Sequence, residues 1–210
     1  MTAGNKKTDI KAYGLRLLLS SHPEVRRLKR KHTPSVHGNK HWSTSWLLID
    51  HIKKTRLESV SKILEIGCGW GLTGIFCAKK FAATVTAVDI DPDIYPYLDL
   101  HARINKVKVE FLNKEFDKIS SSNLRDFDMI IGSDICFWDN LIDPLRRLIQ
   151  RARRASVGQI LIADPGRPTF DSLVESLAPK KGVKVLDREI KKPRRMSGKI
   201  LHITDHLQKR

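Results

Sequence analysis

The sequence predicts an α/β fold: a seven-stranded, mostly parallel sheet with helices on both faces. From residue 60 onward, short apolar or β-branched runs alternate with helical patterns, an order typical of parallel strands joined by helices. About ten residues, including Pro193 and Gly198, join the last two strands. That is short for a crossover helix, so we expect these strands to pair antiparallel and to leave one reversed strand near the C-terminal edge.

Each expected element rests on a local signal. Met129–Ile131 is apolar throughout, as in a strand buried on both faces, and Asp91-Pro92 supplies a helix cap followed by Pro at the first helical position. The expected strands are Lys62–Ile66, Thr84–Asp89, Val107–Leu112, Asp128–Ser133, Gln159–Ala163, Val183–Arg188 and Lys199–Thr204. Helices are expected at Leu72–Phe81, after Asp91-Pro92, from Asp143-Pro144 to near Ala155, and at Asp171–Leu177.

The chain is expected to divide into a basic N-terminal extension, residues 1–41, and a main domain, residues 42–210. The extension should be partly helical, because Ile10–Leu19 shows some helical periodicity. The main domain should open with a helix that starts at Ser43–Ser45 and ends near Arg56.

Composition and charge limit the possible functions. The chain has 210 residues and a net charge of +16; residues 1–60 carry 13 Lys and Arg against 4 acids, whereas residues 61–120 carry 8 of each. A neutral centre between basic ends favours a small-ligand module whose flanks meet an acidic partner. No apolar run approaches a membrane span, and three cysteines without C-x-x-C spacing argue against a disulfide scaffold. A cytoplasmic location is therefore expected.

The strongest motif is the segment Glu65-Ile66-Gly67-Cys68-Gly69-Trp70-Gly71, which directly follows an expected strand. Glycines allow a tight turn and bring bare backbone to a ligand, while the next helix offers free N–H groups. Asp89 ends the following strand, where a carboxylate can accept both hydroxyl groups of a ribose. The segment therefore predicts a nucleotide-type site.

Two kinds of cofactor could bind at this glycine turn and Asp89. Gly69–Gly74 matches the G-x-G-x-x-G pattern of dinucleotide-binding proteins, but Gly67-Cys68 intervene between the strand and that pattern. Glu65 inside the turn would repel a pyrophosphate, whereas it would attract an ammonium group. S-adenosylmethionine has such an ammonium group, together with a ribose for Asp89.

The segment resembles motif I of the class I S-adenosylmethionine-dependent methyltransferases, and Ala87–Asp91 resembles their second motif. The resemblance covers about residues 40–205 and implies a Rossmann-like fold with the reversed late strand. It implies that Glu65 and the Gly67–Gly71 backbone hold the methionine part, and that Asp89 holds the ribose. It also implies adenine contacts from Ile90 and Asn113. Trp42 and Trp46, which precede the domain, either close over the cofactor or belong to the core. The residues expected to bind the cofactor are Glu65, Gly67, Cys68, Gly69, Gly71, Asp89, Ile90, Asn113, Trp42 and Trp46.

The end of the fourth strand bears on the methyl acceptor. Asp134-x-x-Phe137 resembles the Asp-x-x-Tyr element of the family 16 protein lysine methyltransferases, with Phe137 in place of the usual Tyr. The electron-transfer-flavoprotein lysine branch also has a tryptophan-led helix and an Asp-Pro-Gly-Arg stretch, here Asp164–Arg167. The resemblance implies that Asp134 and Phe137 are the catalytic residues, with Asp134 orienting the incoming amine.

The sequence is also compatible with other methyl acceptors. An RNA acceptor would suit the charge of +16, although the chain lacks an Asn/Asp-Pro-Pro-aromatic element, and Cys136 lacks the context of a pyrimidine-attacking nucleophile. A small-molecule acceptor and a non-catalytic cofactor-binding module are the further alternatives. Arg194 and Arg195, between the last two strands, and Arg167 are expected to dock an acidic acceptor surface. The scattered histidines suggest no metal site.

Overall fold

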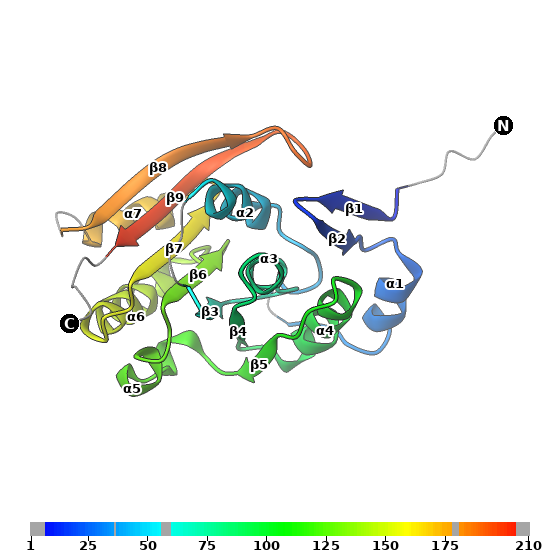
Figure 1. Ribbon diagram of the computed structural model, residues 1–210, viewed down its shortest axis with the longest axis horizontal. Helices are drawn as coiled ribbons and strands as arrows, with labels where there is room; N and C mark the ends of the chain where they lie inside the picture. The colour runs from blue at the N-terminus through cyan, green and yellow to red at the C-terminus, as the bar shows by residue number, and fades with distance from the viewer. Residues whose placement is uncertain (1–6, 36, 56–59, 178–180, 205–210) are drawn as a thin grey trace.

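The computed structural model describes residues 7–35, 37–55, 60–177 and 181–204 (Figure 1). A seven-stranded sheet in the order β5-β4-β3-β6-β7-β9-β8 forms the centre of the molecule. Its strands are β3 (Lys62–Ile66), β4 (Thr84–Asp89), β5 (Glu110–Asn113), β6 (Met129–Ser133), β7 (Gln159–Asp164), β8 (Val183–Ile190) and β9 (Met196–Thr204). The predicted fold class is confirmed.

The direction of the strands also follows the prediction. Strands β3 to β7 pair parallel, whereas β9 pairs antiparallel with β7 on one side and with β8 on the other. The short connection after β8 forces a hairpin, so β9 is the one reversed strand of this sheet. Strand β3 lies between β4 and β6, and the order of connections therefore reverses at β3.

Helices form one layer on each face of the sheet (Figure 1). One layer contains α2 (Thr44–Lys54), α3 (Leu72–Phe81) and α4 (Tyr95–Ile104), and the other contains α5 (Ser121–Leu124), α6 (Ile142–Arg154) and α7 (Pro168–Leu177). In α6 the apolar side chains recur at helical spacing, so Leu145, Leu148, Ile149 and Ala152 are buried. No helix among the described residues is long and apolar enough to cross a membrane.

The N-terminal region corrects one prediction. The helix expected over Ile10–Leu19 is wrong, because the chain forms a hairpin of β1 (Asp9–Ala12) and β2 (Leu15–Leu18). Tyr13 and Gly14 form the turn with φ of 52° and 77°, the left-handed pair that two-residue hairpins favour. Packing decides the outcome, since the hairpin buries the leucines of β2 in the main core.

Helix α1 (Pro23–Lys29) follows the hairpin, and the whole region is fastened to α4. The side chain of Asn105 accepts a hydrogen bond from the Arg16 N–H and donates one to the Arg16 carbonyl, each at 2.8 Å. His101 Nε2 lies 3.3 Å from the Leu18 backbone nitrogen. Residues 7–35 are therefore packed against the main domain.

Apart from the short helix α5, which was not predicted, the differences in the main domain lie at the ends of elements. Strand β5 begins at Glu110 rather than at Val107, because the Val107 N–H is used by the Ala102 carbonyl at the end of α4. Helix α2 ends at Lys54, and the expected end at Arg56 lies outside the described residues. The bounds of β3, α3 and β4 agree with the expected ones.

Candidate active site

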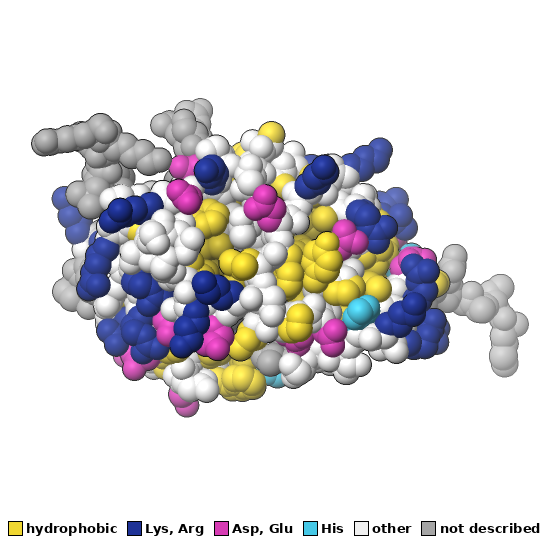
Figure 2. Space-filling view, turned by 90° about the horizontal axis from the view of Figure 1, so that it is seen from below, with side chains coloured by type: hydrophobic (Ala, Val, Ile, Leu, Met, Phe, Trp, Pro, Cys, Tyr) yellow, Lys and Arg dark blue, Asp and Glu magenta, His cyan; other side chains and the backbone are white. Residues whose placement is uncertain are grey.

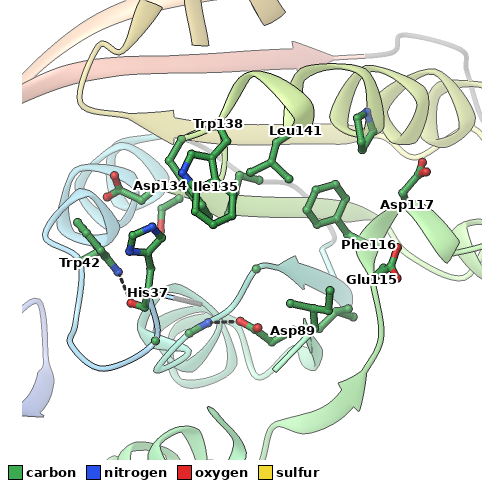
Figure 3. Close-up of a pocket in the computed structure, with 18 of the residues that line it drawn as sticks. His37, Trp42, Asp89, Glu115, Phe116, Asp117, Asp134, Ile135, Trp138 and Leu141 are labelled. Atoms are coloured by element: carbon green, nitrogen blue, oxygen red, sulfur yellow. Dashed lines mark hydrogen bonds between the residues drawn. The ribbon is translucent and has the colours of Figure 1, made fainter. Parts of the chain in front are cut away.

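A cavity of about 710 Å³ opens at the carboxyl edge of the sheet, beyond the ends of β3, β4 and β6 (Figure 3). This is the point where the order of connections reverses, the usual ligand position in open α/β sheets. Its volume suits a cofactor-sized molecule. The predicted site residues in its wall are Trp42, Gly67, Gly69, Asp89, Ile90, Asp134, Phe137 and Arg167.

The glycine turn after β3 forms one wall. Gly67 and Gly69 have φ of 56° and 50°, which side chains rarely adopt. A Cβ atom on Gly67 would lie 2.6 Å from Ile135 Cγ2, whereas one on Gly69 would meet no atom within 4 Å. Gly69 therefore presents bare backbone beside open space. Cys68 and Gly71 do not line the cavity: the Cys68 N–H donates to Val88 at 3.0 Å, and Gly71 caps α3.

Asp89, the last residue of β4, lies beside this turn. Its Oδ2 accepts the Gly69 N–H at 3.0 Å and its Oδ1 accepts the Asp91 N–H at 3.1 Å. Burial raises the pKa of this carboxyl, and the two N–H groups oppose that rise. Each oxygen keeps a lone pair for a further donor, so Asp89 can accept ribose hydroxyl groups from the cavity.

Glu65 has a different place from the one expected. Its carboxylate does not line the cavity; Oε2 accepts the Gly74 N–H of α3 at 3.1 Å. Burial raises the pKa of Glu65 to about 8. The orphan N–H groups in the first turn of α3 explain this orientation, because a buried carboxyl finds its donor there. In this structure Glu65 stabilises the start of α3.

The residues after β4 and β5 form the opposite wall. The Ile90 side chain is 54% exposed and lines the cavity, as an adenine neighbour should. Asn113 does not line it: its Nδ2 donates to the carbonyls of Asp89 and Ile90, at 3.1 and 2.8 Å, and so fixes the loop. Phe116, which the sequence reasoning missed, lines this wall three residues beyond Asn113. Its only sequence signal was an aromatic side chain shortly after a strand.

The two tryptophans near the start of α2 have different surroundings. Trp42 lines the cavity and donates from Nε1 to the His37 carbonyl at 2.9 Å (Figure 3). Trp46 is 1% exposed and stacks on Tyr13 at 5.9 Å, so it belongs to the core and does not reach the cofactor site. Trp42 lies in the loop before the N-cap Ser43, whereas Trp46 lies in the first turn of α2 and is buried.

Asp134 follows β6 and lies across the cavity from Asp89 (Figure 3). Its φ of 60° is left-handed, and its backbone N–H donates to the Ala163 carbonyl at 3.0 Å. Oδ1 accepts from Arg167 Nη2 at 2.6 Å. The other oxygen, Oδ2, is buried and has no hydrogen-bond partner among the described residues.

Arg167 corrects another expectation. It was expected to dock an acidic acceptor surface, but its guanidinium bridges Asp134 and Asp164, with Nη1 at 2.8 Å from Asp164 Oδ2. The carboxylates of Asp134 and Asp164 are nearly inaccessible, with side chains 4% and 1% exposed. Arg167 is therefore an internal part of the cavity wall.

Aromatic rings from two distant segments meet beside Asp134. His37 lies 4.9 Å from Phe137 and 5.4 Å from Trp138, and the latter two rings are 4.7 Å apart. The His37 segment is held by Trp70 Nε1, which donates to the Gly38 carbonyl at 2.9 Å. The sequence reasoning missed His37 and Trp138, since neither belongs to a strand-end motif.

The remaining predicted residues lie outside the cavity. Arg194 donates to Ser43 Oγ, and Arg195 forms an ion pair with Glu189 at 2.6 Å. Both follow β8 at the carboxyl edge of the sheet, the same edge as the cavity. Cys136 is buried, and burial raises the pKa of its thiol to about 11, as for a packed thiol. The described residues include no group of three His, Cys, Asp or Glu suited to a metal ion.

The wall fits S-adenosylmethionine. Bare backbone at Gly67 and Gly69 suits the methionine part, the Asp89 carboxylate suits a ribose diol, and apolar Ile90 and Phe116 suit a purine. The donor set and the shape of the turn therefore favour S-adenosylmethionine.

Comparisons with known proteins support the same cofactor. A family model described as a methyltransferase domain matches residues 63–156. The chain is 27% identical over 148 residues to the electron transfer flavoprotein beta subunit lysine methyltransferase of Homo sapiens, covering 64% of this chain and 52% of that protein. It is 34% identical over 122 residues to the ribosomal protein L11 methyltransferase of Methylococcus capsulatus, covering 57% and 38%. The chain spans about half the length of the curated relatives it matches.

Solved structures show the same fold. The tRNA (uracil-54, C5)-methyltransferase of Pyrococcus abyssi, in complex with S-adenosyl-L-homocysteine, covers 93% of this chain and 43% of its own, with TM-score 0.60 and 18% identity. The plantazolicin methyltransferase BpumL in complex with SAH covers 88% and 91%, with TM-score 0.56 and 14% identity. The chain therefore contains a methyltransferase domain, has the fold of the class I S-adenosylmethionine-dependent methyltransferases, and resembles the electron-transfer-flavoprotein lysine methyltransferases.

Proposed function

We propose that this protein transfers a methyl group from S-adenosylmethionine to the side-chain amine of a lysine in a protein acceptor. The observation that carries the proposal is the unpartnered Oδ2 of Asp134, buried in the cavity wall across from Asp89. A buried carboxylate oxygen without a donor is costly, and an N–H group of the acceptor would satisfy it. Names of similar proteins support a protein acceptor, since they include methyltransferases of a lysine and of a ribosomal protein.

Methyl transfer depends more on aligning the acceptor amine with the methyl group than on proton transfer. S-adenosylmethionine supplies a methyl group on a sulfonium and leaves as a neutral thioether. Asp134 accepts one N–H of the acceptor amine and so points its lone pair across the cavity, toward the cofactor side of the wall. Phe137 and Trp138 exclude water beside it, and their ring faces suit an alkyl amine. Asp89 and the glycine turn hold the cofactor on the other side.

The acceptor is proposed to present an acidic surface. The net charge is +16, and Figure 2 shows a band of apolar side chains with Lys and Arg gathered toward both ends of that face. Arg194 and Arg195 lie on the cavity edge of the sheet, where an incoming acidic segment would meet them. The same charge favours the second candidate, an RNA acceptor.

The two candidates are separated by identifying the labelled product. The protein is incubated with S-adenosylmethionine carrying a tritiated methyl group and either purified electron transfer flavoprotein beta subunit or a cell extract. We expect label that resists nuclease, is lost with protease, and is recovered as methyllysine after acid hydrolysis. The Asp134→Ala variant in the same extract is the control. Label that disappears with nuclease would refute the lysine proposal and establish the RNA alternative.

A further inference from the structure

The Arg167 guanidinium touches two carboxylates at the cavity wall. Its Nη2 lies 2.6 Å from Asp134 Oδ1, and its Nη1 lies 2.8 Å from Asp164 Oδ2. The Arg167 side chain is 26% exposed, whereas the two carboxylates are almost fully covered. One guanidinium therefore joins the end of β6 to the end of β7.

The Asp164 side of this bridge is fixed. Asp164 Oδ1 accepts the backbone N–H groups of Gly166 and Arg167, at 2.8 and 2.7 Å. Asp164 thus holds both the backbone and the side chain of Arg167. Because a guanidinium is a planar, rigid fork, fixing one nitrogen also fixes the direction of the N–H that points at Asp134.

The charges of the three groups leave the site negative. Two carboxylates share one guanidinium, so the ionised cluster carries a formal charge of −1. Buried carboxylates are stable only when paired, and this pairing occupies Arg167 from both sides. The remaining negative charge attracts an amine rather than an acidic acceptor. A docking role for Arg167 is therefore at odds with its surroundings.

We propose that Arg167 is a positioning residue: it holds the Asp134 carboxylate by Oδ1, so that Oδ2 is presented to the acceptor amine. This inference rests on the proposed function, in which Asp134 orients that amine. In this proposal Arg167 acts through its ion pair with Asp134. The left-handed backbone of Asp134 contributes to the same placement.

A double-mutant cycle tests the proposal, with electron transfer flavoprotein beta subunit as acceptor. We expect kcat to fall about 10-fold in Arg167→Lys and about 100-fold in Arg167→Ala, with KM for the acceptor within about 2-fold of wild type. In an Asp134→Ala background, Arg167→Ala should cause no further loss, because the two residues act as one unit. A raised KM with unchanged kcat, or additive losses in the cycle, would overturn the proposal in favour of docking.

Crystal structures give a readout that needs no acceptor. In Arg167→Ala the Asp134 carboxylate should leave the position it has in the wild type, and in Arg167→Lys it should stay closer to it. A carboxylate that stays in place in both variants overturns the positioning role even if the lysine proposal fails. Thermal melting shows that each variant is folded. Arg103→Lys, at the exposed ion pair with Asp99 on α4, where neither residue lines the cavity, is the matched control and should keep full kcat.

Discussion

The two halves of the cavity are built in different ways. The half proposed to hold the cofactor consists mainly of the turn after β3 and the residues at the end of β4, within residues 67–90, with Phe116 beside them. The acceptor half gathers side chains from around residues 37, 134 and 167, three segments far apart in the chain. A short motif can specify the first half, whereas only the packing of distant segments produces the second. The variants below test this division.

The largest effect is expected in the acceptor half. Asp134→Ala should lower turnover by about 10²- to 10⁴-fold, the range for a positioned acid–base or orienting group. Cofactor affinity measured by calorimetry should not change, since Asp134 lies across the cavity from Asp89. Asp139→Ala, which removes an exposed carboxylate directly after Trp138, is the matched control. Equal turnover in mutant and wild type would reduce Asp134 to a structural residue.

In the cofactor half, Asp89→Ala should weaken S-adenosylmethionine binding by about 30- to 150-fold. The loss of charge-assisted hydrogen bonds to a diol costs about 2–3 kcal/mol. Calorimetry with S-adenosylhomocysteine measures it directly. Asp99→Ala, which removes a surface ion pair with Arg103 on α4, should leave the affinity unchanged. An unchanged affinity in Asp89→Ala would remove the ribose role.

A third variant tests whether Glu65 binds the cofactor or only stabilises the fold. Burial raises its pKa to about 8 from an ordinary 4.5. The protonated form is therefore favoured in the folded protein, and this contribution to stability is lost as pH rises from 4.5 through 8. Glu65→Gln, which keeps the acceptor for the Gly74 N–H, should remove that loss.

Urea unfolding measures this difference. Between pH 6 and 8, wild type should lose about 2 kcal/mol more stability than Glu65→Gln, because each pH unit below the folded pKa corresponds to about 1.4 kcal/mol. Calorimetry in parallel should show similar cofactor affinity in both proteins at pH 7. A large loss of affinity in Glu65→Gln would return Glu65 to the cofactor-binding residues.

The smallest effect is expected outside both halves. Charge reversal of Arg194 and Arg195 to Glu should raise KM for the acceptor by about 3- to 10-fold, with unchanged cofactor affinity. Exposed charges act over a Debye length of about 8 Å at physiological ionic strength, so added salt should reduce the difference. Lys62→Glu with Lys80→Glu, the same change at the opposite edge of the sheet, is the control. If wild type, the Arg194 and Arg195 variant and the control have equal KM, Arg194 and Arg195 contribute only to solubility.

Much of the fold follows from local sequence. The bounds of β3, α3 and β4 agree with prediction because apolar runs, glycines and Asp89 mark the ends of these elements. The N-terminal hairpin does not follow, since Ile10–Leu19 fits a helix nearly as well, and burial of the β2 leucines against the core decides between the two.

The sequence by itself determined the class I fold, the turn at Gly67–Gly69 and the place of Asp89, because all three depend on residues close together in the chain. Only the tertiary structure decided that Trp42 faces the cavity while Trp46 fills the core, that Glu65 turns toward α3, and that Arg167 bridges Asp134 and Asp164. The physical reason is the compensation of buried polar groups. A buried carboxylate accepts hydrogen bonds from whichever donor the packing brings near it. The residues around the carboxylate in the sequence do not show which donor that is.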